Sequence, residues 1–172
     1  FVYSTESYQT VSAMIMETTE MTDYEYAIIK LFQPLGISPI AFTPDYERMG
    51  NVGRDLFLRP VDFAKIGMLL LNGGVYEDQQ VVPAEWVKKC MTAQTRGKGE
   101  EYPDQGEIDF GYGLWLDEYK DIKVVFAYGK NGQYLIVLPE LGLLLTVTSD
   151  EKEHRVFYRE KLLDWLIAAI VY

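Results

Sequence analysis

The chain has 172 residues, 48% of them apolar and 14% aromatic, so it is long enough for one packed core and is not a disordered tail. Its 26 acidic and 16 basic residues give a formal net charge of −10. This charge argues against nucleic acid and anionic membranes as partners, because both bind basic patches.

The composition also limits the chemistry. Cys90 is the only cysteine and His154 the only histidine, so an intrachain disulfide is impossible and a zinc site is not expected. His154 stands among charged residues, which favours a solvated position over a role in a Ser-His-Asp site. We therefore expect no metal and no cofactor.

The first half of the chain has helical patterns. Apolar residues recur at helical spacing over 7–19, and Thr22 with Glu25 forms the capping-box pattern of a second helix that runs to about residue 32. Pro60 stands at a first helical position and predicts a third helix that is apolar on nearly all sides and therefore buried. The remaining segments are expected to be an irregular loop over 37–58, a short helix after Pro83, and a charged, mobile stretch over 96–107.

In the second half the apolar period changes to two, which is typical of strands. The predicted strands lie at about 112–116, 122–128, 134–138 and 143–148, with short turns between them, and a closing helix is expected over about 153–169. Short turns between consecutive strands predict an antiparallel meander of three or four strands. The sequence thus predicts one α+β unit over 1–172, mainly helical over 1–108 and an antiparallel sheet plus a C-terminal helix over 109–172.

Six motif-like segments follow one another along the chain: 1–5 (FVYST), 32–37 (FQPLGI), 58–67 (LRPVDFAKIG) with its continuation to 82–86 (VPAEW), 110–115 (FGYGLW), 129–133 (GKNGQ) and 139–142 (PELG). In this order they resemble motifs of the class C β-lactamase/penicillin-binding family of serine hydrolases. Each motif is weak alone, and their order and spacing make the resemblance specific. The resemblance implies a partial β-lactamase/transpeptidase-like fold and hydrolysis of an ester or amide through an acyl-enzyme.

The family works with a Ser-x-x-Lys, a Tyr-x-Asn and a Lys-Thr-Gly motif. By this resemblance Tyr3 is the catalytic candidate, a proton shuttle for the acyl-transfer steps. Thr5 replaces the asparagine, and Ala127 replaces the basic residue that would favour a phenolate at Tyr3. Both departures shift the expectation from a true β-lactamase toward an esterase, amidase or peptidase.

The resemblance also supplies the substrate and oxyanion positions. These are Thr5, Tyr128, Gly129, Lys130, Gly132 and Gln133, with the backbone N–H of Lys130 as the oxyanion donor. Without the resemblance, the two glycines read as hairpin residues and the lysine as a solvated turn residue.

In the family the nucleophilic serine precedes the tyrosine motif by a long stretch. We therefore expect the nucleophile in an upstream segment and expect none of the serines at 4, 7, 12, 38 and 149 to replace it. The chain opens at Phe1 inside a motif, which indicates a C-terminal fragment that is inactive alone. The alternative is a non-catalytic homologue that binds peptidoglycan-type peptides or a protein partner.

The expected partners are a small-molecule or peptide substrate, the upstream segment, and a second copy of the chain. The strand at 143–148 is apolar and would form an open sheet edge, which pairs readily with another strand. We expect this edge to be covered by strand addition, by a dimer contact with the second copy, or by a rearranged terminal segment. The resemblance favours a periplasmic or secreted bacterial location.

Overall fold

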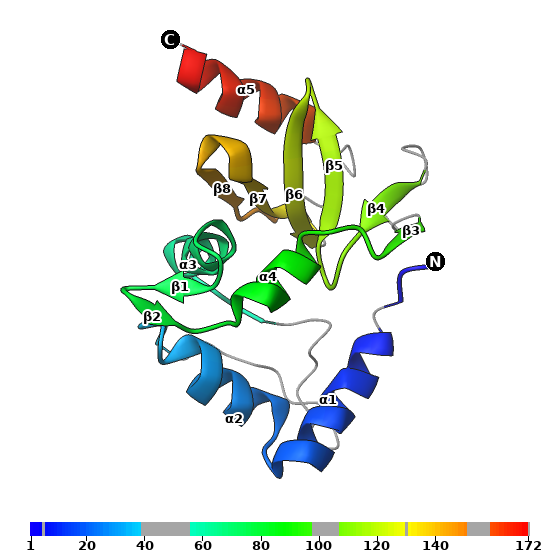
Figure 1. Cartoon of the computed structure of the whole chain (residues 1–172), viewed down its shortest axis with the longest axis vertical. Helices are drawn as coiled ribbons and strands as arrows, with labels where there is room; N and C mark the ends of the chain where they lie inside the picture. Colours follow the sequence, from blue (N-terminus) through cyan, green and yellow to red (C-terminus); the bar gives the residue numbers. More distant parts are fainter. Residues whose placement is uncertain (5, 39–55, 98–106, 130, 151–158, 172) are drawn as a thin grey trace.

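The computed structural model describes residues 1–4, 6–38, 56–97, 107–129, 131–150 and 159–171 (Figure 1). Its centre is an antiparallel sheet in which each strand pairs with its neighbours in sequence, in the order β3-β4-β5-β6-β7-β8. The strands are β3 (Thr95–Gly97), β4 (Ile108–Phe110), β5 (Trp115–Tyr119), β6 (Ile122–Gly129), β7 (Gln133–Leu138) and β8 (Leu143–Val147).

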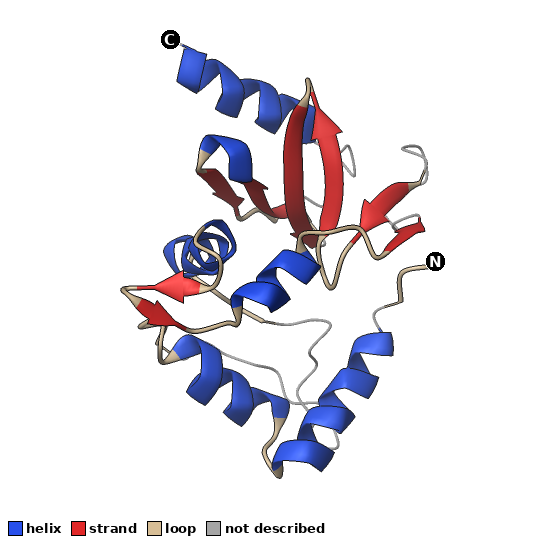
Figure 2. Cartoon of the chain, in the orientation of Figure 1, coloured by secondary structure: helices blue, strands red, loops and turns tan. Residues whose placement is uncertain are grey.

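The predicted meander and the α+β class are confirmed (Figure 2), but three or four strands were too few, since the described residues alone form a sheet of six. The two additional strands, β3 and β4, have three residues each, too few to show a period in the sequence. Their pairing defines them, with Thr95 opposite Phe110 and Gly97 opposite Ile108. The first predicted strand also begins later than expected, at Trp115.

The helices follow the predicted order. They are α1 (Glu6–Thr19), α2 (Asp23–Ala27) continued by the π-helix η1 (Ile28–Phe32), α3 (Pro60–Leu71), α4 (Ala84–Cys90) and α5 (Arg159–Val171), with a small hairpin of β1 (Val75–Tyr76) and β2 (Gln79–Gln80) and the 3₁₀ turn η2 (Pro139–Leu141). The capping box is present, because Glu25 N donates to Thr22 Oγ1 at 3.1 Å and Thr22 N donates to Glu25 Oε2 at 2.9 Å. The expected start of the last helix at 153 lies outside the described residues. None of the described helices is long and apolar enough to cross a membrane.

Helices cover both faces of the sheet. On one face, Phe126 and Ile136 pack with Leu163 of α5. On the opposite face, Leu135 and the neighbouring apolar residues pack against α3. The α3 helix approaches closely at Gly67, where an added Cβ would lie 2.8 Å from Leu135 Cδ1. The sheet is therefore the middle layer between α5 and α3.

The prediction of a third helix buried on all sides was wrong. Helix α3 buries Asp62, Gly67 and Leu69 but leaves Val61 60% and Met68 41% exposed. These two exposed residues are seven positions apart, so they share one flank of the helix. A continuous apolar run does not reveal which flank lacks a neighbour, and the tertiary structure decides this.

Candidate active site

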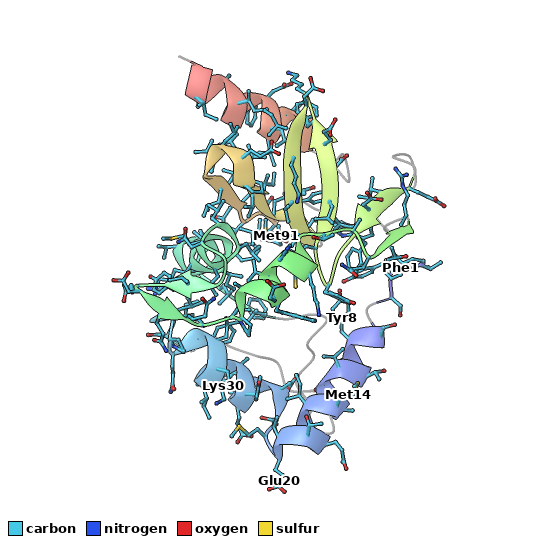
Figure 3. The ribbon with its side chains drawn as sticks, viewed as in Figure 1. Phe1, Tyr8, Met14, Glu20, Lys30 and Met91 are labelled. Atoms are coloured by element: carbon cyan, nitrogen blue, oxygen red, sulfur yellow. The ribbon has the colours of Figure 1, made fainter. Side chains whose placement is uncertain are left out.

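Tyr3 lies at the start of the chain, half-buried against aromatic side chains of the sheet. Its ring centroid is 6.0 Å from that of Trp115 and 6.3 Å from that of Phe110, which it meets edge-on at 85°. Phe1 stacks on Phe110 at 4.9 Å, and an added Cβ at Gly97 would collide with the Phe1 carbonyl oxygen. The sheet thus holds the first residues of the chain close to β3 and β4, as Figure 3 shows for Phe1.

Strand pairing explains why these aromatic residues meet. Phe110 of β4 is the cross-strand partner of Trp115 of β5, and Trp115 is the partner of Phe126 of β6. Side chains two apart on a strand share a face, so Tyr128 lies on the same face as Phe126. The rings of Trp115 and Tyr128 stack with centroids 6.1 Å apart. Two predicted site residues, Tyr3 and Tyr128, therefore contact the same tryptophan.

Ala127, in contrast, lies on the opposite face of β6. It packs with the cluster that contains Val125 and Leu135 and faces α3, whereas Tyr3 packs with the cluster on the α5 face. A side chain at position 127 therefore points away from the sheet face that Tyr3 contacts. The family resemblance linked the phenolate form of Tyr3 to a basic residue at position 127. In this structure the side chain at that position lies on the other face of the sheet from Tyr3.

Tyr8 is a residue of this site that the sequence reasoning placed only as a helical repeat position. It lies in the first turn of α1, and its ring centroid is 5.8 Å from that of Tyr3. Burial raises the pKa of the Tyr8 hydroxyl well above its ordinary value, and the charge of Tyr3 and a hydrogen bond with Tyr3 raise it further. Tyr8 is therefore a direct neighbour of Tyr3 in this site. The signal in the sequence is a tyrosine five residues after the motif tyrosine, just inside a helix.

The turn between β6 and β7 is tied to the segment that follows β8. The Gln133 side-chain amide donates to the Ser149 carbonyl, and Ser149 N donates to Gln133 Oε1 at 3.3 Å. Asn131 Nδ2 donates to Asp150 Oδ1 at 3.1 Å. Gly132 has a φ of +88°, and an added Cβ would lie 3.2 Å from Ser149 Cβ. The Gln133 amide thus anchors this turn through the backbone of Ser149.

The structure brings together four of the predicted substrate and oxyanion residues. Tyr128, Gly129, Gly132 and Gln133 belong to one hairpin, in which Gly129 pairs with Gln133. Thr5 and Lys130, including the proposed oxyanion donor, lie outside the described residues.

One of the chain's own serines has the family's spacing to a lysine, which the sequence reasoning missed. Ser149 is followed by Lys152 at the third position. This pair follows β8 instead of preceding Tyr3, and Lys152 lies outside the described residues. Another serine, Ser12, is completely buried in α1. A lysine three residues after a serine is therefore, by itself, a weak criterion for the nucleophile.

Metal-binding side chains and surface cavities are the other features that could mark a functional site. The described residues contain no group of three or more histidine, cysteine, aspartate or glutamate side chains that could hold a metal ion. A shallow cavity of about 560 Å³ lies beside β4 and β5 and is lined by residues that include Arg96, Asp109 and Lys123. Arg96 and Asp109 form an ion pair at 3.5 Å, and Lys123 Nζ donates to the Met91 carbonyl oxygen at 2.9 Å. None of the site residues that the structure describes lines this cavity.

These elements form part of a β-lactamase-like fold, as the sequence resemblance implied, and solved structures show the same fold. A Bacillus anthracis protein assigned as a 6-aminohexanoate-dimer hydrolase superposes with a TM-score of 0.82 at 19% identity, over 99% of this chain and 44% of its own. A penicillin-binding protein homologue from Caulobacter crescentus superposes with a TM-score of 0.60 at 13% identity, over 82% of this chain and 50% of its own.

The chain thus spans about half the length of these two structures. No protein-family model and no curated protein sequence matches it. At these identities the comparisons establish the fold, and the chemistry depends on the residues of the site.

Proposed function

We propose that the chain is part of a serine hydrolase that cleaves an ester or amide through an acyl-enzyme, with Tyr3 as the proton shuttle. The observation that carries this proposal is the position of Tyr3. Its ring is held by Phe110 and Trp115, and its hydroxyl is hydrogen-bonded to Tyr8. A tyrosine fixed at both the ring and the oxygen is suited to directed proton transfer.

The proposed mechanism begins from the low nucleophilicity of a serine hydroxyl. A serine is a weak nucleophile until a neighbouring base removes its proton. The Tyr3 phenolate would accept that proton as the serine oxygen attacks the carbonyl carbon, and would then return it to the leaving alcohol or amine. Water would cleave the acyl-enzyme by the same steps in reverse order. The serine itself would come from the part of the fold that this chain does not span.

The substrate class is narrowed by the departures from the family motifs. Thr5 offers a hydroxyl where the family has an amide that can both donate and accept, so recognition of a β-lactam side-chain amide is weakened. The name of the Bacillus anthracis neighbour refers to a dimer of 6-aminohexanoate. We therefore propose a simple ester, a linear amide or a D-amino-acid peptide ahead of a β-lactam.

The second candidate is a non-catalytic module that binds peptidoglycan-type peptides or a protein partner. Two observations favour it: Ala127 lies on the sheet face opposite to Tyr3, and the Gln133 amide is bonded to Ser149. The bonded Gln133 amide is not free to bind a substrate, and a side chain at position 127 points away from Tyr3 and does not assist it.

Expression of the longer protein, including the segment that precedes Tyr3 in its gene, separates these candidates. The hydrolase proposal predicts turnover of p-nitrophenyl esters or linear amides and a covalent acyl adduct in mass spectrometry of the intact protein. Binding of a D-amino-acid peptide without turnover or adduct would contradict it and support the binding module.

A further inference from the structure

A two-point hydrogen bond ties the side chain of Gln133 to the backbone of Ser149. Gln133 Nε2 donates to the Ser149 carbonyl oxygen, and Ser149 N donates to Gln133 Oε1 at 3.3 Å. Only one orientation of the amide satisfies both bonds, because Nε2 is a donor and Oε1 is an acceptor. The amide is therefore engaged inside the protein at both of its polar atoms.

This contact continues the pairing of β7 and β8 beyond their ladder. The ladder begins with the pair of Tyr134 and Val147, and Ser149 lies two residues beyond that pair. A glutamine side chain presents the same N–H and C=O groups as a peptide unit, so Gln133 pairs with Ser149 as a backbone neighbour would. The segment that leaves β8 is thereby held against the turn between β6 and β7.

The turn also fits closely against this segment. Asn131 and Gly132 have φ values of +66° and +88°, the conformation that an Asn-Gly pair adopts readily in a tight hairpin. An added Cβ at Gly132 would lie 3.2 Å from Ser149 Cβ, and Asn131 Nδ2 donates to Asp150 Oδ1 at 3.1 Å. Contacts from neighbouring turn residues therefore fix one face of the turn to residues 149–150.

We propose that Gln133 is a positioning residue: its side-chain amide holds the β6–β7 turn against Ser149, so that backbone N–H groups of the turn keep the position in which they stabilise an oxyanion. This inference rests on the proposed function, because an oxyanion forms only where the site carries out acyl transfer. N–H groups that are already in place stabilise the developing charge without reorganising. A loosened turn should therefore slow turnover and leave substrate affinity nearly unchanged.

The contact itself is tested on this chain by amide hydrogen exchange observed with NMR. Gln133→Ala removes the acceptor of the Ser149 N–H, which should then exchange about 2- to 10-fold faster, the equivalent of one hydrogen bond. Gln94→Ala is the matched control, since Gln94 Nε2 also donates to backbone carbonyl oxygens, those of Lys89 and Thr92, both at 3.2 Å. It should leave the exchange of Ser149 unchanged. Equal Ser149 rates in the wild type and Gln133→Ala would overturn the proposal.

The role in catalysis is tested in the longer protein by steady-state kinetics. Gln133→Ala should lower kcat for p-nitrophenyl esters about 10- to 100-fold with little change in KM, less than the complete loss of an oxyanion donor. Rates are expressed per acylated site, counted by mass spectrometry, so that a smaller folded fraction does not lower them. Gln94→Ala should leave kcat and KM unchanged. A raised KM at unchanged kcat would show that Gln133 binds substrate and would overturn the proposal.

A thionoester substrate separates positioning from a general loss of structure. Sulfur in place of the carbonyl oxygen accepts hydrogen bonds weakly, so a fixed set of N–H donors favours the oxygen ester. Gln133→Ala should reduce this preference about 10-fold, because its donors are no longer held in place. A lowered kcat with the preference of the wild type would show a structural role and overturn the proposal.

The two proposals fail in different ways. If the longer protein turns over an ester or amide and Gln133→Ala changes neither kcat nor the preference for the oxygen ester, only the role of Gln133 is wrong. If the longer protein forms no acyl adduct at all, the hydrolase proposal is wrong, and the positioning role of Gln133 falls with it even where hydrogen exchange shows the contact.

Discussion

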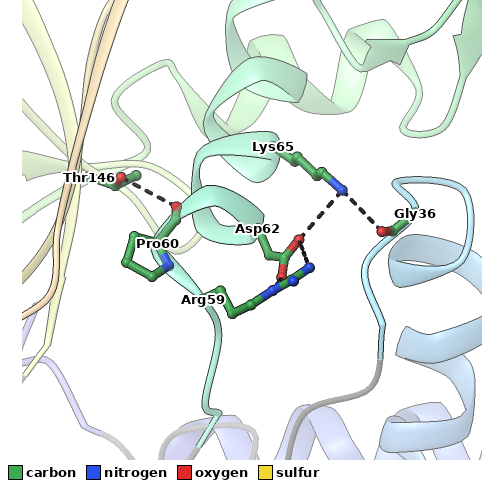
Figure 4. A network of polar contacts seen from close by, with 6 residues as sticks. All are labelled: Gly36, Arg59, Pro60, Asp62, Lys65 and Thr146. Atoms are coloured by element: carbon green, nitrogen blue, oxygen red, sulfur yellow. Dashed lines mark hydrogen bonds and ion pairs between the residues drawn. The ribbon is translucent and has the colours of Figure 1, made fainter.

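Arg59 and Asp62 form a two-point ion pair at the start of α3, with Nε 2.6 Å from Oδ2 and Nη2 3.2 Å from Oδ1 (Figure 4). The Asp62 side chain is completely buried, whereas that of Arg59 is 65% exposed. Lys65 Nζ lies 3.4 Å from Asp62 Oδ1 and donates to the Gly36 carbonyl oxygen at 3.0 Å. Asp62 thus connects the first turn of α3 to the turn that follows the π-helix.

This network predicts a pH-dependent stability. The hydrogen bond from Arg59 is the main cause that holds the Asp62 pKa below its ordinary value. A lowered folded-state pKa contributes stability that is present above the unfolded pKa, about 4 for aspartate, and is lost as the pH falls through the folded pKa. We expect Asp62→Asn to cost about 1–3 kcal/mol at pH 7 and to weaken the loss of stability below about pH 4.

Urea unfolding of the wild type and the variant between pH 7 and pH 3 measures this effect. Asp109→Asn is the control, because Asp109 forms its ion pair with Arg96 on the surface, where such pairs contribute about 0–1 kcal/mol. Parallel pH profiles for the wild type and Asp62→Asn would show that the ion pair does not contribute to stability.

The proposed role of Tyr3 predicts a large effect on turnover and a small effect on folding. In the longer protein, Tyr3→Phe should lower kcat at least ~100-fold, the lower range for the loss of a general base. The ring contacts with Phe110 and Trp115 are retained by phenylalanine, so the Tm should change little. Steady-state kinetics and thermal melts measure both quantities, with Tyr26→Phe as the control. Near-normal turnover would reduce Tyr3 to a packing residue.

The chain as printed should not form an acyl-enzyme. We expect no covalent labelling by a fluorescent penicillin or a fluorophosphonate, because the proposed nucleophile lies upstream of Tyr3. Mass spectrometry of the treated protein checks this, and Ser149→Ala is the informative variant, since Ser149 has the spacing to Lys152. Labelling that disappears in Ser149→Ala would assign the nucleophile to this chain and contradict the prediction.

The edge of the sheet at β8 predicts self-association. Among the described residues, β8 has β7 as its ladder neighbour and no strand on its other side. Apolar surface lies beside it: Val61 and Met68 are exposed on α3, which packs against β8. On the other face, Ile170 of α5 is 46% exposed although it lies two turns after the completely buried Leu163, on the same side of the helix. Unpaired backbone groups beside apolar surface favour the addition of a strand.

We therefore expect the chain to form dimers through β8, detected by analytical ultracentrifugation over a range of concentrations. Thr146→Lys, in the interior of β8, should weaken dimerisation about 10-fold, because two like charges would meet in an antiparallel pair. Thr18→Lys adds the same charge on the exposed side of α1 and should have no effect. A monomer at every concentration would show that water alone satisfies this edge.

Local sequence signals predicted much of the fold because they act within one or two turns of chain. The capping box of Thr22 and Glu25, the proline at the start of α3 and the short apolar runs of β6 and β7 each depend on neighbours in sequence. Because the turns between consecutive strands are short, these strands pair as an antiparallel meander. The short strands β3 and β4 escaped prediction because pairing between distant residues, and not their own pattern, makes them strands.

For the candidate site, too, some features followed from the sequence and others only from the tertiary structure. Order and spacing of short motifs singled out Tyr3 and the hairpin from Tyr128 to Gln133 by family resemblance, and each of these signals lies within a few residues. Only the tertiary structure decided that Tyr8 hydrogen-bonds to Tyr3, that the Gln133 amide is bonded to Ser149, and that Asp62 is buried with its charge paired. These contacts depend on which face of a strand or helix meets which neighbour, and a hydrogen bond or a buried charge is set by that environment and not by residue type.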